Sequence, residues 1–260
     1  MSSELIEVAG TRLSITQLGD PHAGLYRLLW GHGWGQTGAA FLAMAETLKP
    51  LAASTLIDFP GFGKSPVPPE TWGTAEYADC AAELIKASVT QPVIWIGHSF
   101  GCRVGLQLAA RHPGLLAGMV LIAAAGLKRQ RSVMERIRFE SRKFAFKTAK
   151  LFTREGPQRD QLRQRFGSQD YRNAGALRPI MVRVIGEDLT EVAKEVRCPT
   201  LLIYGSYDTE TPPEFGERFK ALIPESALAI LDGFNHLSIL TEGRHQVTLR
   251  IRKFMESLGQ

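Results

Sequence analysis

The sequence contains few cysteines, and this scarcity excludes two kinds of cross-linked protein. Only three occur among 260 residues, Cys80, Cys102 and Cys198, and no two of them form a Cys-x-x-Cys pair. An odd number of widely spaced cysteines argues against a disulfide framework and against a zinc site. We therefore expect these side chains to be buried free thiols.

Long apolar segments are also absent. The longest uninterrupted one, residues 119–127, has nine residues, whereas a helix that crosses a bilayer needs about 20. The first ten residues, MSSELIEVAG, include an early acidic residue and no basic segment followed by an apolar run. They do not have the pattern of a secretory signal. The sequence thus predicts no transmembrane segment and a cytoplasmic location.

The overall composition is that of an ordinary globular protein. Hydrophobic residues make up 44% and charged residues 22%, with 25 glycines and 14 prolines, which excludes intrinsic disorder and collagen-like repetition. There is no internal repeat and no low-complexity tract. A chain of this length fits either one large α/β domain with an insertion or two separate domains.

Short apolar runs alternate with stretches of helical periodicity, which is typical of a mostly parallel sheet covered by helices. The predicted strands are residues 13–18, 26–30, 54–58, 93–97, 119–124, 200–204 and 228–231. The predicted helices are residues 39–48, 75–89, 103–111, 213–222 and 246–258. This alternation predicts an α/β fold.

The alternation stops between residues 127 and 196, where no convincing strand occurs. We interpret this stretch as an inserted helical subdomain, with the core formed by residues 1–126 and 197–260. Residues 128–183 contain 16 basic and five acidic side chains, a net charge of +11, so the rest of the chain carries −6. Such a basic helical surface either interacts with solvent alone or attracts an acidic ligand, a carrier protein or a membrane surface. We expect no nucleic-acid partner.

The clearest motif is GHSFG at residues 97–101, which follows an apolar strand and opens a helix. This is the context of a nucleophile elbow. The sharp turn strains the serine, and the positions two before and two after it must lack bulk so that strand and helix can approach. Gly97 and Gly101 meet that requirement. We predict that Ser99 is a nucleophile.

A serine hydroxyl is a weak nucleophile and needs a base held by a third group. Among the six histidines, His236 stands out because it ends the segment DGFNH, in a loop after a late strand and ahead of the last helix. His98 adjoins the serine, so its side chain is expected to point elsewhere from the turn. His112 precedes Pro113 at a helix end, where a surface or capping role is expected.

Asp208 is the predicted orienting acid. It follows the strand at residues 200–204, and catalytic groups of such folds gather at the carboxyl ends of the strands. Asp232 is the main competitor. It lies only four residues before His236, and we expect it to hold the histidine loop.

The segment GHGWG at residues 31–35 follows the strand at 26–30. It is flexible enough to aim backbone N–H groups at the negative charge of a tetrahedral intermediate. We assign the oxyanion-hole donors to Trp34 and to Phe100, the residue after the nucleophile. His32 is expected to be structural within the loop, and the residues predicted to border the substrate pocket are His32, Gly33 and Leu237, with Phe144 and Phe152 as further candidates from the insertion.

A rival interpretation starts from the same loop. Residues 33–38 also satisfy G-x-G-x-x-G, with Asp58 twenty residues beyond Gly38, as in a dinucleotide-binding unit. Against it, the bulky Trp34 separates the first two glycines, and the next strand runs into FPGFG at residues 59–63 and not into a crossover helix. A dinucleotide-binding oxidoreductase and a non-catalytic ligand-binding protein are the alternatives from other functional classes.

Taken together, the chain resembles the α/β-hydrolase superfamily over nearly its whole length. The motifs that carry the resemblance, in chain order, are residues 31–35, 58–65, 97–101, 205–208 and 235–236. The chain order Ser99, Asp208, His236 is also that of this superfamily. The resemblance implies an eight-stranded, mostly parallel sheet, a helical cap inserted after the sixth strand, no cofactor and no metal.

The superfamily supports many chemistries on one fold. We expect a serine hydrolase that cleaves a carboxylic ester or thioester of a small acyl substrate through an acyl-enzyme. A carbon–carbon bond hydrolase or a perhydrolase on the same triad is the alternative, whereas serine at position 99 argues against the dehalogenase and epoxide hydrolase branches. The segment HGWG at residues 32–35 is also similar to that of carboxylesterases that cleave a pimeloyl-carrier-protein methyl ester, and a basic cap would suit an acidic carrier.

Overall fold

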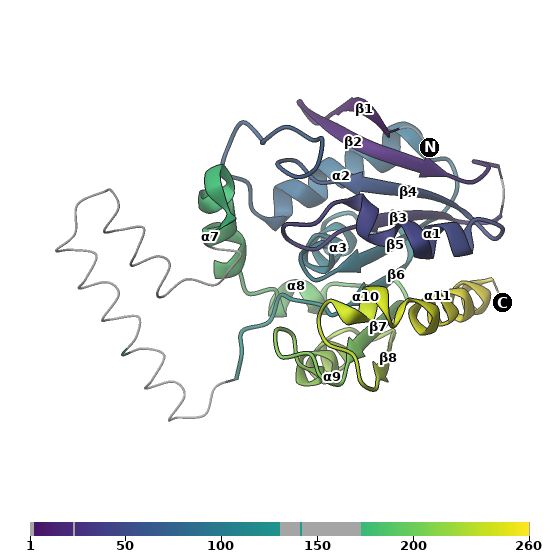
Figure 1. Ribbon diagram of the computed structural model, residues 1–260, viewed down its shortest axis with the longest axis vertical. Coiled ribbons are helices and arrows are strands. Elements are labelled where there is room, and N and C mark those ends of the chain that lie inside the picture. Colours follow the sequence, from purple (N-terminus) through teal and green to yellow (C-terminus); the bar gives the residue numbers. More distant parts are fainter. Residues whose placement is uncertain (1–2, 23, 131–140, 142–172, 260) are drawn as a thin grey trace. The chain divides into compact units, whose positions relative to one another are not determined.

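The computed structural model in Figure 1 describes residues 3–22, 24–130, 141 and 173–259. The chain divides into two compact units, one formed by residues 1–127 and 183–260 and the other by residues 128–182. Residues 183–196, which the sequence analysis assigned to the insertion, group with the first unit. Phe144 and Phe152, the two candidates for pocket lining from the insertion, lie outside the described residues.

The first unit contains one eight-stranded sheet in the order β1-β2-β4-β3-β5-β6-β7-β8. The strands β1 and β2 are antiparallel to their neighbours, and all pairs from β4 to β8 are parallel. The expected fold class, an α/β-hydrolase-like sheet of eight mostly parallel strands, is confirmed. The strands are β1 (Ser3–Val8), β2 (Thr11–Leu18), β3 (Arg27–Gly31), β4 (Ala53–Asp58), β5 (Val93–His98), β6 (Leu116–Ile122), β7 (Thr200–Gly205) and β8 (Ser226–Leu231).

The position of each strand in the sheet follows from its residues. The central strand β5 reads VIWIGH and is buried at every position, because a parallel strand covered on both faces tolerates a continuous apolar run. The edge strand β1 reads SELIEV and is exposed over most of its length. All seven predicted strands are present with ends that differ by at most three residues. The sequence does not predict β1, because the acidic residues of SELIEV interrupt its apolar run and do not alternate regularly with apolar residues.

Helices flank the sheet on both faces (Figure 1). The five predicted helices are present, and α7 and α8 fall within residues 127–196, which the sequence predicts to be helical. The sequence does not predict α10, because its four residues are too few for helical periodicity. The described helices are η1 (Gly38–Phe41), α1 (Leu42–Leu48), α2 (Thr74–Ser88), α3 (Phe100–Arg111), η2 (Gly175–Leu177), α7 (Arg178–Gly186), α8 (Thr190–Lys194), α9 (Pro213–Leu222), α10 (Ser238–Thr241) and α11 (Arg244–Leu258).

Helices α1 and α11 pack together on one face of the sheet, and α2, α3, α8 and α9 form a contiguous row on the other. The core under α1 and α11 brings together side chains from distant parts of the chain, such as Trp30, Phe41, Ile94 and Ile251, all fully buried. Burying large apolar side chains contributes about 1.5–3 kcal/mol each. This layered core holds the strand ends in fixed positions.

The chain re-enters the first unit at Arg183 and is fixed there by polar contacts. Arg183 forms an ion pair with Glu76 on α2. The carboxylate of Glu187 accepts a hydrogen bond from the backbone N–H of Thr74 at 3.0 Å. The partly buried guanidinium of Arg103, on α3, donates to the Val184 carbonyl at 3.1 Å. Residues 183–187 are thereby tied to α2 and to α3, the helix that begins directly after Ser99.

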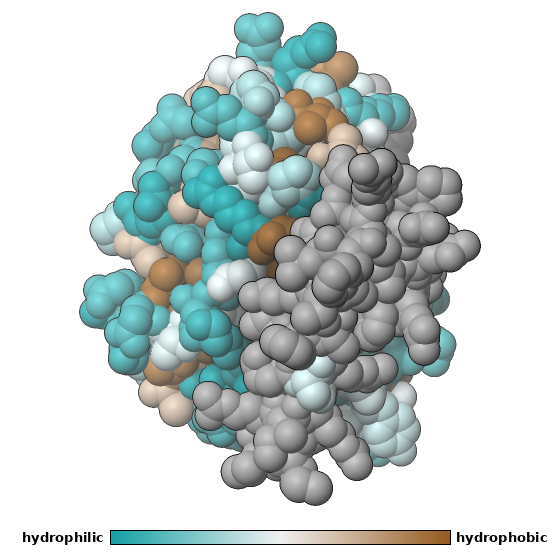
Figure 2. All heavy atoms as spheres, turned by 90° about the vertical axis from the view of Figure 1, so that its left-hand side faces the viewer, coloured by the Kyte–Doolittle hydropathy of each residue, from teal (hydrophilic) through white to brown (hydrophobic). Residues whose placement is uncertain are grey.

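The three cysteines are free thiols, with Cys80 and Cys102 buried and Cys198 half-buried. On the face in Figure 2, the described residues are mostly hydrophilic, and their apolar groups form small separate patches. Among the described residues, no helix combines the length and the apolar character that crossing a membrane requires.

The layered core predicts a large difference between two isoleucines of the sheet. Ile94 on β5 is fully buried, whereas Ile230 on the edge strand β8 is 45% exposed. We expect Ile94→Ala to lower the free energy of unfolding by about 2–5 kcal/mol because it leaves a cavity, and Ile230→Ala by less than about 1 kcal/mol. Urea denaturation of both variants measures this, and equal losses would contradict the assigned sheet order.

Candidate active site

Ser99 lies at the turn between β5 and α3 and has a strained backbone. Its φ is 48° and its ψ is −102°, a conformation that costs a residue other than glycine about 1–3 kcal/mol. The Ser99 N–H donates to the Ile122 carbonyl at 3.1 Å, which ties the turn to the neighbouring strand β6. The side chain is only partly buried. The turn therefore has the geometry of a nucleophile elbow, with its serine within reach of solvent.

The two flanking glycines are required by close backbone contacts. A Cβ at Gly97 would lie 2.6 Å from the Gly101 carbonyl oxygen, and a Cβ at Gly101 would overlap the Gly31 carbonyl. Trp95 adds a hydrogen bond from its indole N–H to the same Gly101 carbonyl, at 3.0 Å. The glycines thus let α3 approach the ends of β3 and β5, as the sequence analysis predicted.

Asp208 and His236 form a buried hydrogen-bonded pair. The distance between His236 Nδ1 and Asp208 Oδ2 is 2.7 Å, and the two residues are 7% and 3% exposed. Asp208 follows β7 and His236 follows β8, so parallel pairing of these strands brings residues 28 positions apart into contact. Since Nδ1 faces the carboxylate, the second ring nitrogen, Nε2, is the one turned away from Asp208.

Further donors hold the Asp208 carboxylate. Its Oδ1 accepts backbone N–H bonds from Glu210 and Thr211, both at 2.8 Å, and its Oδ2 accepts the Thr211 hydroxyl at 2.9 Å. Burial alone raises the pKa of Asp208, but hydrogen bonds from His236 and Thr211 outweigh it and bring the pKa below its ordinary value. The carboxylate is therefore ionised at neutral pH and favours a proton on Nδ1 of His236.

The loops that carry this pair are joined to each other. The Tyr207 N–H donates to the Phe234 carbonyl at 2.9 Å. The Ser206 hydroxyl donates to Asp232 at 2.8 Å, so Asp232 holds the histidine loop, as the sequence analysis expected of it. Leu237, a predicted pocket residue, is 56% exposed directly after His236. These bonds limit how far the acid and the histidine can move apart.

The glycine-rich loop after β3 forms a tight turn. The Gln36 N–H donates to the Gly33 carbonyl at 3.1 Å, and Gly35 has a φ of 71°, which favours glycine at that position of a turn. The Trp34 ring packs edge-on against the Phe100 ring, with 5.5 Å between centroids. In the part of the chain that the structure describes, the backbone N–H groups of Trp34 and Phe100 make no hydrogen bond.

His32 lies beneath this loop and is completely buried. Its Nδ1–H donates to the Gly33 carbonyl at 2.7 Å, and its Nε2 accepts the Phe59 N–H at 3.0 Å. Burial lowers the pKa of His32 to about 4, so the ring is neutral. With both nitrogens engaged inside the protein, the side chain does not border an open pocket. The expectation of a pocket-lining role is thus wrong for the His32 ring, whereas its structural role in the loop fits the geometry.

Sequence reasoning missed three polar side chains around the histidine. Thr211 was detectable in principle, because a threonine three residues after Asp208 has the spacing of a local side-chain to backbone turn. Glu210 places Oε2 3.7 Å from Nε2 of His236, and its side chain is 63% exposed. His98 is buried and its ring lies 4.9 Å from that of His236, between centroids. Nothing in the sequence around Glu210 or His98 signals these contacts.

Asp58, the acidic residue of the rival nucleotide-binding interpretation, makes hydrogen bonds within the protein. Asp58 accepts the N–H of Gly38 at 2.9 Å and that of Lys64 at 3.1 Å. Its carboxylate thus fixes the start of η1 to the loop after β4. This geometry gives Asp58 a structural role in place of the ribose contact that a dinucleotide site requires.

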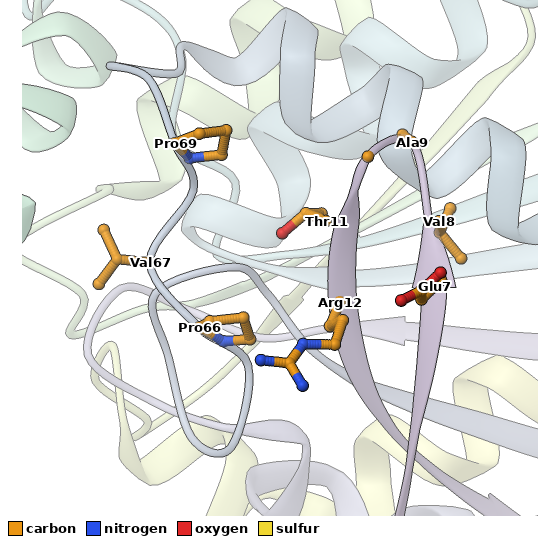
Figure 3. A pocket seen from close by; sticks show the side chains of 9 residues that line it. Glu7, Val8, Ala9, Thr11, Arg12, Pro66, Val67 and Pro69 are labelled. Carbon is orange, nitrogen blue, oxygen red and sulfur yellow. The ribbon is translucent and has the colours of Figure 1, made fainter.

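A second His–Asp pair, His112 with Asp79 at 2.8 Å, lies outside the predicted site residues. A pocket of about 490 Å³ lies beside the turn between β1 and β2, where Arg12 extends toward Pro66 (Figure 3), and it contains none of the predicted site residues. Within residues 3–22, 24–130, 141 and 173–259, no group of three or more His, Cys, Asp or Glu side chains could hold a metal ion.

The glycine contacts at the elbow predict the effect of adding one methyl group. We expect Gly101→Ala to reduce the free energy of unfolding by about 1–3 kcal/mol, because the new Cβ overlaps a carbonyl that cannot move without shifting β3. The matched control is Gly186→Ala, since a Cβ at Gly186 meets no atom within 4 Å. Thermal denaturation compares the two, and similar melting temperatures would refute the close approach of β3 and α3.

The sequence is similar to a described protein family and to named esterases. A sequence model of the alpha/beta hydrolase family matches residues 28–247. The chain is 26% identical to the pimeloyl-[acyl-carrier protein] methyl ester esterase of Chromobacterium violaceum over 226 residues, 81% of this chain and 87% of the relative. It is 22% identical to the esterase of the same name from Vibrio campbellii, over 86% of this chain and 92% of the relative.

Solved structures show the same fold. A bacterial membrane phospholipase A, described as a virulence factor, superposes with a TM-score of 0.78 at 20% identity, covering 100% of this chain and 87% of its own. An esterase from Exiguobacterium antarcticum gives a TM-score of 0.75 at 20% identity, covering 98% and 100%. With the family model spanning most of the sheet and all three predicted triad positions, the chain belongs to the alpha/beta hydrolase family.

Proposed function

We propose that this chain is a serine carboxylesterase in which Ser99, His236 and Asp208 act as a catalytic triad. The observation that carries the proposal is the buried 2.7 Å contact between His236 Nδ1 and Asp208 Oδ2, together with a strained serine at a nucleophile elbow. Catalysis needs both the strained serine and the oriented histidine, since the hydroxyl attacks only when a base that is itself held in place takes its proton.

In the first half of the reaction, the Ser99 hydroxyl attacks the ester carbonyl and Nε2 of His236 takes its proton. Asp208 keeps the other proton on Nδ1 and stabilises the positive charge that develops on the ring. His236 then protonates the leaving alcohol, and an acyl-enzyme remains on Ser99. In the second half, His236 removes a proton from water, which attacks the acyl group and releases the acid.

The backbone N–H groups of Trp34 and Phe100 are the proposed oxyanion-hole donors. Phe100 is the first residue of α3, where the helix dipole favours negative charge. Contact between the Trp34 and Phe100 rings supports the proximity of the two N–H groups. Donors of this kind contribute about 3–4 kcal/mol each to stabilising a transition state.

The names of the sequence relatives suggest a substrate class. These proteins are esterases that act on the methyl ester of a pimeloyl group carried by an acyl-carrier protein. We propose that the substrate here is also an ester on an acyl chain borne by an acidic carrier. The net charge of +11 on residues 128–183 suits such a partner, because opposite charges speed association and fix orientation. The proposed role of this segment is therefore a basic cap that receives the carrier.

The test is hydrolysis of a methyl ester by the purified protein, three variants of the proposed triad and one control variant. We expect Ser99→Ala and His236→Ala to lower kcat by about 10³-fold or more, and Asp208→Asn to cause a comparable loss, because the amide favours the wrong tautomer of His236. Asp79→Asn is the matched control, since Asp79 also pairs with a histidine, His112, but lies on α2 outside the proposed triad. If Ser99→Ala keeps most of its activity, the proposed triad is wrong.

The same assay separates the substrate alternatives. An acyl methyl ester attached to a carrier protein is compared with the same ester on a short thiol, at low and at high salt. A preference for the carrier-bound ester that fades with salt is expected, because screening weakens charge attraction. Equal rates at every salt concentration would remove the carrier from the proposal and leave the esterase reaction intact.

A further inference from the structure

His98 contacts two loops that carry different parts of the proposed active site. Its Nδ1 lies 3.2 Å from Oε1 of Gln36, in the tight turn that carries Trp34. Its Nε2 lies 3.0 Å from the backbone carbonyl of His236. His98 is also the last residue of β5, directly before Ser99. The buried ring of the residue before Ser99 thus contacts both the turn that carries a proposed oxyanion donor and the backbone of the proposed base.

The space around the ring is filled on the side of the turn. A Cβ added to Gly33 would come within 2.7 Å of both the His98 ring and the Gln36 side chain. The Gly33 N–H donates to the same Gln36 Oε1 at 2.9 Å. The ring, the Gln36 amide and the backbone of Gly33 therefore form one packed unit, so that a movement of the His98 ring moves the turn.

The tautomer of the ring follows from its partners. Burial, and then the nearby His236, lower the pKa of His98 to about 3, so the ring carries a single N–H at neutral pH. The carbonyl of His236 can only accept a hydrogen bond, which places this hydrogen on Nε2 of His98. The Nε2–H then donates to the backbone of the residue whose side chain is the proposed base. Nδ1 carries no hydrogen in this tautomer, so its contact with Oε1 of Gln36 is a packing contact and not a hydrogen bond.

We propose that His98 is a positioning residue that couples the turn carrying Trp34 to the backbone of His236 and so keeps the oxyanion donor and the base in register. The inference rests on the proposed esterase function. It assigns no proton transfer to His98, because its Nε2–H is bound to the His236 carbonyl and the ring is buried. Its effect is on geometry, where an error of about 1 Å costs up to about 10²-fold in rate.

Three substitutions of His98 separate its hydrogen bond to His236 from its packing. Glutamine places an amide N–H near the position of Nε2 and preserves the bond to His236, asparagine reaches only the position of Nδ1 and loses that bond, and leucine fills space without any hydrogen bond. We expect His98→Leu and His98→Asn to lower kcat by about 10- to 100-fold with KM changed less than about threefold. His98→Gln should stay within about fivefold of wild type. His112→Leu, a histidine at the end of α3 that pairs with Asp79, is the control and should keep its kcat.

A substitution of Gln36 tests the same coupling without leaving a cavity in the core, because the Gln36 side chain is only half-buried. Gln36→Met removes the amide oxygen that holds the Gly33 N–H beside the His98 ring, and we expect kcat to fall about tenfold. The double variant Gln36→Met/His98→Leu should lose less than the product of the two single losses, since both break one connection. Multiplicative losses would contradict the coupling.

A spectroscopic readout keeps the inference testable apart from turnover. Proton–nitrogen NMR of the histidine rings should show His98 as the Nε2–H tautomer without titration between pH 8 and 5. The low-field proton of the hydrogen bond between His236 and Asp208 should exchange with solvent faster in His98→Asn than in His98→Gln. If the two variants behave alike in kcat and in exchange, His98 only fills space. If wild type shows this NMR signature but hydrolyses no ester, the proposed function fails while the coupling stands.

Discussion

The hydrogen bond between Asp208 and His236 is the interaction on which the candidate site depends. A buried carboxylate is costly unless donors surround it, and here the backbone of Glu210, both polar groups of Thr211 and the imidazole of His236 supply them. Because these donors come from the loops after β7 and β8, the acid is stable only when the two loops are closed on each other. The same closure fixes the orientation of the imidazole, so that stability and chemical competence arise from one arrangement.

The sheet brings the remaining parts to this pair. The strands β3, β5, β7 and β8 are parallel, so the loops at their carboxyl ends gather at one edge and deliver the glycine-rich turn, Ser99, Asp208 and His236 from widely separated stretches of sequence. Two devices then set the finer geometry. The glycines at positions 97 and 101 let β3, β5 and α3 approach. Buried histidines contact neighbouring loops: His32 bonds to the loops after β3 and β4, and His98 packs against the glycine-rich turn and bonds to the loop after β8.

The sequence was sufficient where a local rule determines the structure. Gly97, Ser99 and Gly101 were assigned because a strained turn demands those residue types, and β5 because an apolar run of that length suits a central strand. The sequence was insufficient where the outcome depends on contacts between distant residues. The acidic edge strand β1 is stabilised only by pairing with β2, and the contact of His98 with His236 joins residues 138 positions apart. For His32, the loop that surrounds it buries the ring, and no local pattern distinguishes a buried loop histidine from one that borders a pocket.

The central claim is that His236, held by Asp208, makes Ser99 a reactive nucleophile. Covalent labelling of the purified protein with a fluorophosphonate, with the modified residue located by mass spectrometry, tests it most directly because it requires no knowledge of the substrate. The account predicts that Ser99 alone is modified in the folded protein, and that His236→Ala abolishes the modification while the protein stays folded. An unreactive Ser99 in the folded wild type, or labelling that persists without His236, would contradict it.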